Sequence, residues 1–194
     1  MRLPYIPSDP QFPSPEDQAI VSRIQQRRGP NGLLELDRAL LHSPPVADGW
    51  NSFLASIRTQ TSLSISIREL AICRVAVLNR AWYEWDHHAP LLLAASGMTQ
   101  AHVDAVRSLP PHYDRAGESD DVFDEPHRAV LAYVDAMTLD VTVAEEVFGR
   151  VKKAFGEKGS VEVTATVAAY NCVSRFLVAL DVGEMNGKGK EASS

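Results

Sequence analysis

The residue types that could carry acid–base chemistry are concentrated in one stretch of the chain, Arg68 to Gly97. This stretch reads RELAICRVAVLNRAWYEWDHHAPLLLAASG, an apolar helix followed by a short break and a second helix. Glu84 and His88 are four residues apart and therefore share one face of the second helix, while Tyr83 and His87 share the adjacent face. A carboxylate beside an imidazole orients a general base and sets its tautomer. The spacing therefore predicts a catalytic pair on this helix.

A second carboxylate, Glu69, lies on the preceding helix. If the two helices pack as a hairpin, Glu69 returns alongside the face that carries Glu84 and His88. Two simpler interpretations stay open. Ser66-Ile67-Arg68-Glu69 matches the S-x-x-E capping box, in which Glu69 would only hold a helix end, and Glu84 with His88 could form a solvated pair on an exposed face. The aromatic residues that flank Glu84 favour burial of this face: Trp82, Tyr83 and Trp85. A buried Glu84 carboxylate would require a partner.

The stretch resembles the carboxymuconolactone decarboxylase family, which belongs to the alkylhydroperoxidase-D-like superfamily. The pattern of this family is an Arg-Glu-Leu that opens a helix, an intervening segment, Cys-x-x-Cys-x-x-x-His, and a Gly that ends the second helix. Arg68-Glu69-Leu70, His88 and Gly97 fit it, whereas Ala81 and Glu84 stand where the redox branch has its two cysteines. The string Tyr-Glu-Trp around Glu84 resembles the cysteine-free decarboxylase branch. The resemblance covers roughly residues 40 to 183 and is specific over residues 68 to 97.

This resemblance implies an all-α fold and a homo-oligomer, a trimer or hexamer first and a dimer next. It also implies a cofactor-independent, lyase-type enzyme that acts on a small organic acid or lactone by decarboxylation, or by a related isomerisation, hydration or dehydration. In this interpretation His88 is the general acid–base, and Glu84 and Glu69 orient it and tune its pKa. Tyr83 stabilises charge that develops on an oxygen.

Other residues are candidates for binding the substrate. The last helix carries a polar patch within an otherwise apolar run, VAAYNCVSRFLVAL. In this patch Arg175 could bind a substrate carboxylate bidentately, or it could pair with an acid on a neighbouring helix. The predicted substrate-binding residues are Trp85, His87, Tyr170, Asn171 and Arg175.

Two other function classes stay open. A thiol-dependent peroxidase or its reductase partner is disfavoured because the chain has no CxxC, and Cys73 sits in an apolar helix where a reactive thiolate is not favoured. A non-catalytic, oligomeric small-molecule-binding protein on the same fold is the remaining alternative. Glu84-x-x-His87 matches the Glu-x-x-His of di-iron bundles, but those sites need a second copy. Neither a metal nor a cofactor is predicted.

Composition narrows the class of protein further. A chain of 194 residues with 45% hydrophobic content fits one domain with a sizeable core. The net charge of −6 and the pI near 5.5 argue against a nucleic-acid surface. The sequence shows no apolar run long enough for a membrane span and no signal-peptide h-region at the N-terminus. Cys73 and Cys172 form no zinc or CxxC spacing, and we expect a reduced, cytoplasmic compartment.

Helical signals extend over the rest of the chain and predict one all-α domain of about eight or nine helices over residues 15 to 183. A Pro-rich arm, residues 1 to 14, is either a loose tail or packs on a neighbouring subunit, and residues 184 to 194 form a flexible tail. Pro110 to Asp124 reads as a loop that either links two helical halves or covers the site. A capping box at Thr142 and Glu145 and a start at Ser160 predict two separate helices near the end. The expected helices span residues 15–28, 33–41, 46–60, 67–78, 82–96, 100–109, 126–139, 142–156 and 160–181.

Overall fold

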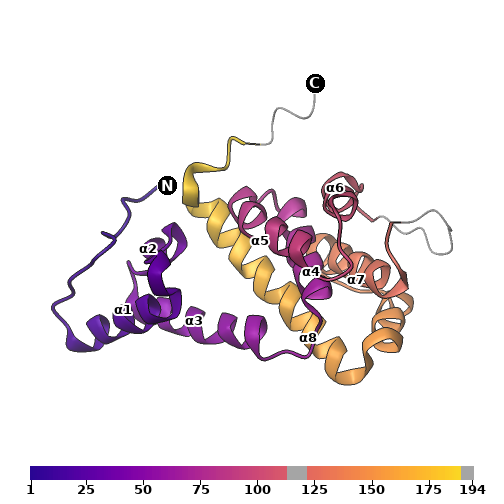
Figure 1. Ribbon diagram of the computed structural model, residues 1–194, viewed down its shortest axis with the longest axis horizontal. Helices are drawn as coiled ribbons and strands as arrows, with labels where there is room; N and C mark the ends of the chain where they lie inside the picture. The colour runs from indigo at the N-terminus through magenta and orange to yellow at the C-terminus, as the bar shows by residue number, and fades with distance from the viewer. Residues whose placement is uncertain (113–121, 189–194) are drawn as a thin grey trace.

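The computed structural model describes residues 1–112 and 122–188, and every regular element in these residues is helical. This confirms the predicted all-α class. In Figure 1, α8 crosses the molecule, with α4 to α7 on one side of it and α1 to α3 on the other. The helices are α1 Pro15–Arg28, α2 Glu35–Leu40, α3 Pro44–Thr59, α4 Ile65–Leu78, α5 Trp82–Ala94, α6 Gln100–Ser108, α7 Glu125–Asp135 and α8 Glu145–Leu180. Short 3-10 turns span Gly29–Asn31 and Val182–Glu184, and a π-helical turn spans Ala136–Asp140.

Helix α4 is the centre of the fold because its sequence is apolar on nearly every side. Leu70, Ile72 and Val75 are fully buried, and α4 packs against α5, α6, α7 and α8. Between α4 and α5, Arg80 adopts a left-handed conformation with φ 56°, which turns the chain back on itself. The two helices therefore form the predicted hairpin.

A buried ion pair joins α4 to α7. The Arg74 side chain is 0% exposed, and its Nε and Nη2 donate to the two carboxylate oxygens of Asp135 at 2.6 and 2.7 Å. The same guanidinium donates to the carbonyl groups of Val106, Leu109 and Pro110 at 3.3, 2.9 and 2.9 Å. One arginine thus ties α4, α7 and the end of α6 together, with its donors satisfied as a buried charge requires.

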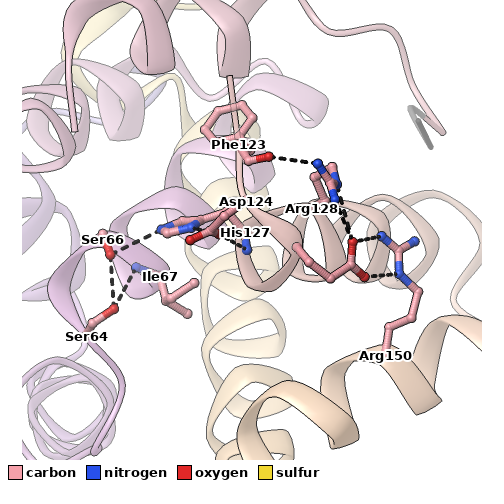
Figure 2. Close-up of polar contacts among 9 residues, drawn as sticks. Ser64, Ser66, Ile67, Phe123, Asp124, His127, Arg128 and Arg150 are labelled. Carbon is pink, nitrogen blue, oxygen red and sulfur yellow. Dashed lines mark hydrogen bonds and ion pairs between the residues drawn. The ribbon is translucent and has the colours of Figure 1, made fainter. Parts of the chain in front are cut away.

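Figure 2 shows how α7 is held at the N-terminus of α4. His127 lies with Nε2 3.2 Å from the Ser66 hydroxyl and with Nδ1 2.5 Å from a carboxylate oxygen of Asp124, which caps α7. The cap of α4 is Ser64, whose hydroxyl accepts a backbone N–H. The capping-box interpretation of Glu69 is therefore wrong, because the helix begins two residues earlier than that box requires. Glu69 is free of a capping role.

Several helix boundaries in the last third of the chain differ from the prediction. Helix α8 consists of two helical parts that meet at Gly156, where φ 68° and ψ −172° are not helical, so the predicted helix end near Gly156 is confirmed. The Ser160 hydroxyl donates to the Gly156 carbonyl at 2.7 Å, and the second part therefore begins before Ser160. The start of α8 has no side-chain cap, so the predicted capping role of Thr142 is wrong.

The N-terminal arm packs on its own chain and is therefore not the loose tail that was one of the two predicted alternatives. The backbone N–H of Arg2 donates to the last carbonyl of α8 at 2.8 Å. The Tyr5 hydroxyl accepts the N–H of Gly183 at 2.8 Å, and Arg38 of α2 donates from Nε to the carbonyl of Ile6 at 2.6 Å. The arm thereby connects α2 to the end of α8 (Figure 1).

Parts of two predicted segments lie outside the described residues: most of the loop, 113–121, and the end of the tail, 189–194. Helix α8 is long and apolar enough to cross a membrane by composition alone. In the fold, 44% of its most apolar window is buried, and core helices pass the same test. Composition alone therefore does not indicate a membrane span.

Candidate active site

A cavity of about 270 Å³ lies between α5 and the helices that surround it. Its apolar lining comes from α2, α5 and α8. Its polar lining comes from α1, α3, α4 and α5 and comprises Arg28, Arg58, Arg68, Glu69, Tyr83, Glu84, His87 and His88. The structure thus brings the four predicted catalytic residues to one cavity, together with His87.

The central contact of the cavity joins Glu69 of α4 to His88 of α5. His88 Nδ1 lies 2.6 Å from Glu69 Oε2, and the two side chains are only 9% and 4% exposed. Because the carboxylate oxygen accepts, Nδ1 carries the proton in the neutral imidazole and Nε2 keeps its lone pair. No hydrogen bond to Nε2 is made within residues 1–112 and 122–188. The free nitrogen is the one a general base needs.

Burial and pairing act in opposite directions on this pair. Burial lowers the pKa of His88 below its ordinary value of 6.5, and the hydrogen bond and charge of Glu69 offset this only in part. Burial alone would raise the pKa of Glu69, but the hydrogen bond and charge of His88, followed by Arg68, outweigh it and lower that pKa. Arg68 Nε donates to the second oxygen of Glu69 at 3.2 Å. At neutral pH the pair is an ionised carboxylate beside a neutral imidazole.

Glu84 lies one turn before His88 on the same helix but forms no hydrogen bond with it. The side chain is 2% exposed, and neither carboxyl oxygen has a hydrogen-bond partner within the described part of the chain. Burial raises the pKa of Glu84 well above its ordinary value of 4.5, and the charge of Arg58 opposes this only in part. Both glutamates were predicted to orient His88, but only Glu69 forms a hydrogen bond with it. Burial thus favours the protonated form of Glu84, which can donate a hydrogen bond.

Tyr83 and His87 form the outer part of the site. The Tyr83 hydroxyl donates to Glu35 of α2 at 3.0 Å, and burial followed by Glu35 raises the pKa of this phenol. Its ring lies 4.3 Å from the His87 ring and so close to Gly183 that an added Cβ there would be 2.4 Å from Tyr83 Cδ2. His87 Nδ1 donates to the Tyr83 carbonyl at 2.8 Å. The hydroxyl proton of Tyr83, predicted to stabilise charge on a substrate oxygen, is thus directed to Glu35.

Sequence reasoning missed Arg58, which lines the cavity from the last turn of α3. Its Nε donates to the Tyr170 hydroxyl at 2.6 Å, and its guanidinium carbon lies 5.6 Å from the centre of that ring. The Tyr170 ring in turn meets the His88 ring edge-on at 5.1 Å. A basic residue near a helix C-terminus is ordinary, so no local signal set Arg58 apart. Tyr170 was predicted as a substrate-binding residue. In the structure it contacts Arg58 and His88, which line the cavity, but is not itself part of the lining.

Of the remaining predicted substrate-binding residues, His87 lines the cavity, whereas Trp85, Asn171 and Arg175 do not. Arg175 is exposed on α8 and donates to the carbonyl of Asn171 at 3.1 Å. It is two residues from Val173, which lines the cavity, and therefore points from another face of the helix. The Asn171 amide bonds Thr138 at 3.0 Å and joins α8 to the π-helical turn. Trp85 is buried and packs against an arginine of α6.

No cysteine lines the cavity. Cys73 is fully buried, and burial, followed by the nearby charges of Glu69 and Glu84, raises the pKa of its thiol. Cys172 is exposed on α8. Within the described residues, no three His, Cys, Asp or Glu side chains converge as a metal site. The donors present fit acid–base chemistry.

Comparison with known proteins agrees with this fold and site. Residues 44–109 match the model of the carboxymuconolactone decarboxylase family, and this segment runs from α3 to α6 and carries Arg58, Glu69, Glu84 and His88. No curated protein matches the chain.

Solved structures share the fold at low sequence identity. An uncharacterised peroxidase-related protein from Silicibacter sp. TM1040 is 15% identical with a TM-score of 0.70, covering 94% of this chain and 92% of that one. The debrominase Bmp8 is 16% identical with a TM-score of 0.65, covering 87% and 85%. A protein of unknown function from Agrobacterium tumefaciens, a putative antioxidant defence protein AhpD, is 18% identical with a TM-score of 0.61, covering 72% and 90%.

The family match and the shared fold confirm the predicted resemblance. The chain has the all-α fold of these solved structures, and residues 44–109, which carry the site, are similar to the carboxymuconolactone decarboxylase family.

Proposed function

We propose that this protein is a cofactor-independent acid–base enzyme that transfers a proton to or from carbon in a small organic acid or lactone. The observation that carries the proposal is the 2.6 Å contact between Glu69 and His88 in a cavity where His88 Nε2 is unpartnered. A neutral imidazole held by an ionised carboxylate is ready to accept a proton. Such a site suits an isomerisation, a dehydration or the carbon protonation that follows a decarboxylation.

In the proposed mechanism His88 Nε2 takes the proton from carbon, and the electron pair of the broken C–H bond moves toward the adjacent carbonyl oxygen. The positive charge on the imidazolium is stabilised by Glu69, which stays ionised. The buried, neutral Glu84 supplies a hydrogen-bond donor to the substrate. His88 then returns the proton to carbon at the same or another position, so that the enzyme ends as it began.

Deuterium exchange in D₂O tests this proposal without knowledge of the full reaction. Small lactones and unsaturated carboxylic acids are incubated with the protein, and loss of C–H signals is followed by proton NMR. We expect at least one compound to exchange faster than in buffer, and His88→Gln to lose this rate by about 10²–10⁴-fold. Arg175→Gln, a matched change outside the cavity, should keep it. Exchange that persists in His88→Gln, or no exchange with any member of the panel, would contradict the proposal.

A non-catalytic small-molecule-binding protein is the second candidate. It is favoured by the carboxyl of Glu84, which has no hydrogen-bond partner among the described residues, and by the charge of Arg58, because both groups need a ligand but not a reaction. Binding without exchange in the experiment above would select it. Thiol-dependent chemistry is not proposed, because Cys73 lies outside the cavity lining and its thiol pKa is raised.

We also propose a homo-oligomer, a trimer or hexamer before a dimer, in the cytoplasm. An apolar groove of about 410 Å³ on α8 supports self-association, since it includes Val161, which is 67% exposed. Light scattering at micromolar concentration tests the assembly. A mass of one chain would contradict it.

A further inference from the structure

Three arginines line the cavity, and they differ in how their charges are balanced. Arg28 donates from Nε and Nη2 to the two carboxylate oxygens of Asp37 at 2.7 and 2.9 Å. Arg68 pairs with Glu69. Arg58 has no acidic partner in residues 1–112 or 122–188, and its single hydrogen bond is from Nε to the hydroxyl of Tyr170. Its two terminal nitrogens, with four N–H groups, have no acceptor in the described part of the chain.

The second unbalanced group of the cavity is Glu84. It is one of the largest fully buried side chains, and both of its carboxyl oxygens lack a protein partner. A buried polar group without a partner is costly and is rare in native proteins. Arg58 and Glu84 line the same cavity and influence each other electrostatically, yet they form no ion pair. Both groups therefore have hydrogen-bonding capacity that the protein itself does not use.

We infer that Arg58 and Glu84 together form a subsite for a carboxylate group of the substrate, with the planar fork of Arg58 and the buried, unpartnered carboxyl of Glu84 as its hydrogen-bonding groups. This inference deepens the proposed function, on which its catalytic meaning rests, by assigning the substrate class. A guanidinium fork matches the two oxygens of a carboxylate. Tyr170 is the positioning residue, since its hydroxyl fixes Arg58 Nε and leaves the terminal nitrogens available.

The position of this subsite also bears on the reaction. A carboxylate that is held by a cation is stabilised in its charged form, and loss of CO₂ from it would remove the charge that Arg58 binds. Stabilising the ground state in this way raises the barrier to that step. The carboxylate in this subsite is therefore an anchor that survives the reaction, while His88 acts elsewhere on the substrate.

The subsite has a pH dependence with a definite sign. Because burial raises the pKa of Glu84, its carboxyl is neutral until the pH exceeds that raised value. Ionised Glu84 would repel a carboxylate and compete for Arg58, so affinity falls as pH rises through the Glu84 pKa. In that range binding takes up a proton. The other titratable or charged groups around Glu84 come from α1 (Arg28), α4 (Arg68, Glu69, Cys73), α5 (His87, His88) and α8 (Tyr170).

Among these groups, Tyr170 and Cys73 have raised pKa values, and His88 has a lowered one. The two acids therefore stay neutral, and His88 stays uncharged, as the pH rises from neutral. Glu69 has a lowered pKa and is already ionised. A fall in affinity with rising pH is thus assigned to Glu84.

Calorimetry with benzoate as the probe and neutral benzamide as its matched control tests the subsite. We expect benzoate to bind the wild-type protein more tightly than benzamide, and to bind less tightly with rising pH while taking up protons. Arg58→Gln should weaken benzoate binding by about 10- to 150-fold, the range for charge-assisted hydrogen bonds. Glu84→Gln, which keeps a neutral donor, should retain binding and remove the pH dependence. Arg175→Gln should change neither.

Further variants separate this subsite from loss of fold and from the catalytic proposal. Arg58→Lys keeps the charge but not the fork, so it should bind benzoate with intermediate affinity, and thermal melts verify folding of each variant. His88→Gln should bind benzoate normally while losing deuterium exchange. Equal affinity for benzamide and benzoate, or unchanged affinity in a folded Arg58→Gln, would overturn the inference. So would a pH dependence that persists in Glu84→Gln. If the wild-type protein binds benzoate as expected but catalyses no deuterium exchange, the subsite stands and only the proposed function is contradicted.

Discussion

Replacing Glu69 by Gln tests the coupling between the carboxylate and His88. The amide has nearly the shape of the carboxylate, and its oxygen can still accept the Nδ1 proton, so the tautomer of His88 is preserved. The negative charge 2.6 Å from Nδ1 is lost. Since Glu69 is the group that raises the pKa of His88 against burial, that pKa falls further in the variant.

The size of the effect follows from the type of contact. A hydrogen bond to a charged group contributes about 1.5–3 kcal/mol, and the low exposure of both side chains means that solvent screens it little. If the contact strengthens as the imidazolium forms, its loss slows proton transfer by about 10- to 150-fold. This loss is smaller than that in His88→Gln, because orientation survives.

Two assays check this expectation. Nitrogen NMR of labelled histidine reports the His88 pKa in wild-type and Glu69→Gln protein, and deuterium exchange reports the rate. Ser66→Ala, a change on the same helix outside the cavity lining, is the matched control. A His88 that titrates identically with and without the Glu69 carboxylate would refute the coupling, as would an unchanged exchange rate.

Three further predictions concern stability and thiol chemistry. Arg74→Met leaves Asp135 buried without its partner, so urea denaturation should show a loss of about 3–5 kcal/mol, and a loss under 1 kcal/mol would contradict the assigned role. Gly183→Ala adds a Cβ 2.4 Å from the Tyr83 ring at φ 74°, so it should cost about 1–3 kcal/mol, and an unchanged melting temperature would argue against that close contact. Neither the wild-type protein nor Cys73→Ser should consume hydroperoxide with a dithiol above a heat-treated control. Turnover that disappears in Cys73→Ser would restore the thiol hypothesis.

Much of the fold could be predicted from local sequence. Ser14 and Pro15 marked the start of α1, and the uniformly apolar α4 marked the centre of the domain. Gly156 marked the end of the first part of α8, where the backbone is not helical. Errors arose at the start of the second part, which precedes Ser160, and at Thr142, which does not cap α8.

The site was predictable only as far as spacing and family pattern reach. These placed Glu69 near His88, but an i,i+4 spacing does not decide which carboxylate bonds the imidazole. Arg58 lies 112 positions from Tyr170, and no sequence pattern connects two such distant residues. Arg175 was assigned to the site because the sequence around it is apolar. Which face of α8 lines the cavity depends on how α8 packs, and Arg175 lies on another face.

The central claim is that one cavity holds an ionised Glu69 and a neutral Glu84 around His88. Infrared spectroscopy of protein with carbon-13-labelled glutamate distinguishes a carboxylic acid from a carboxylate directly. The account predicts a band of neutral glutamic acid at neutral pH that disappears in Glu84→Gln and remains in Glu69→Gln. Absence of that band, or its disappearance in Glu69→Gln with retention in Glu84→Gln, would contradict the account.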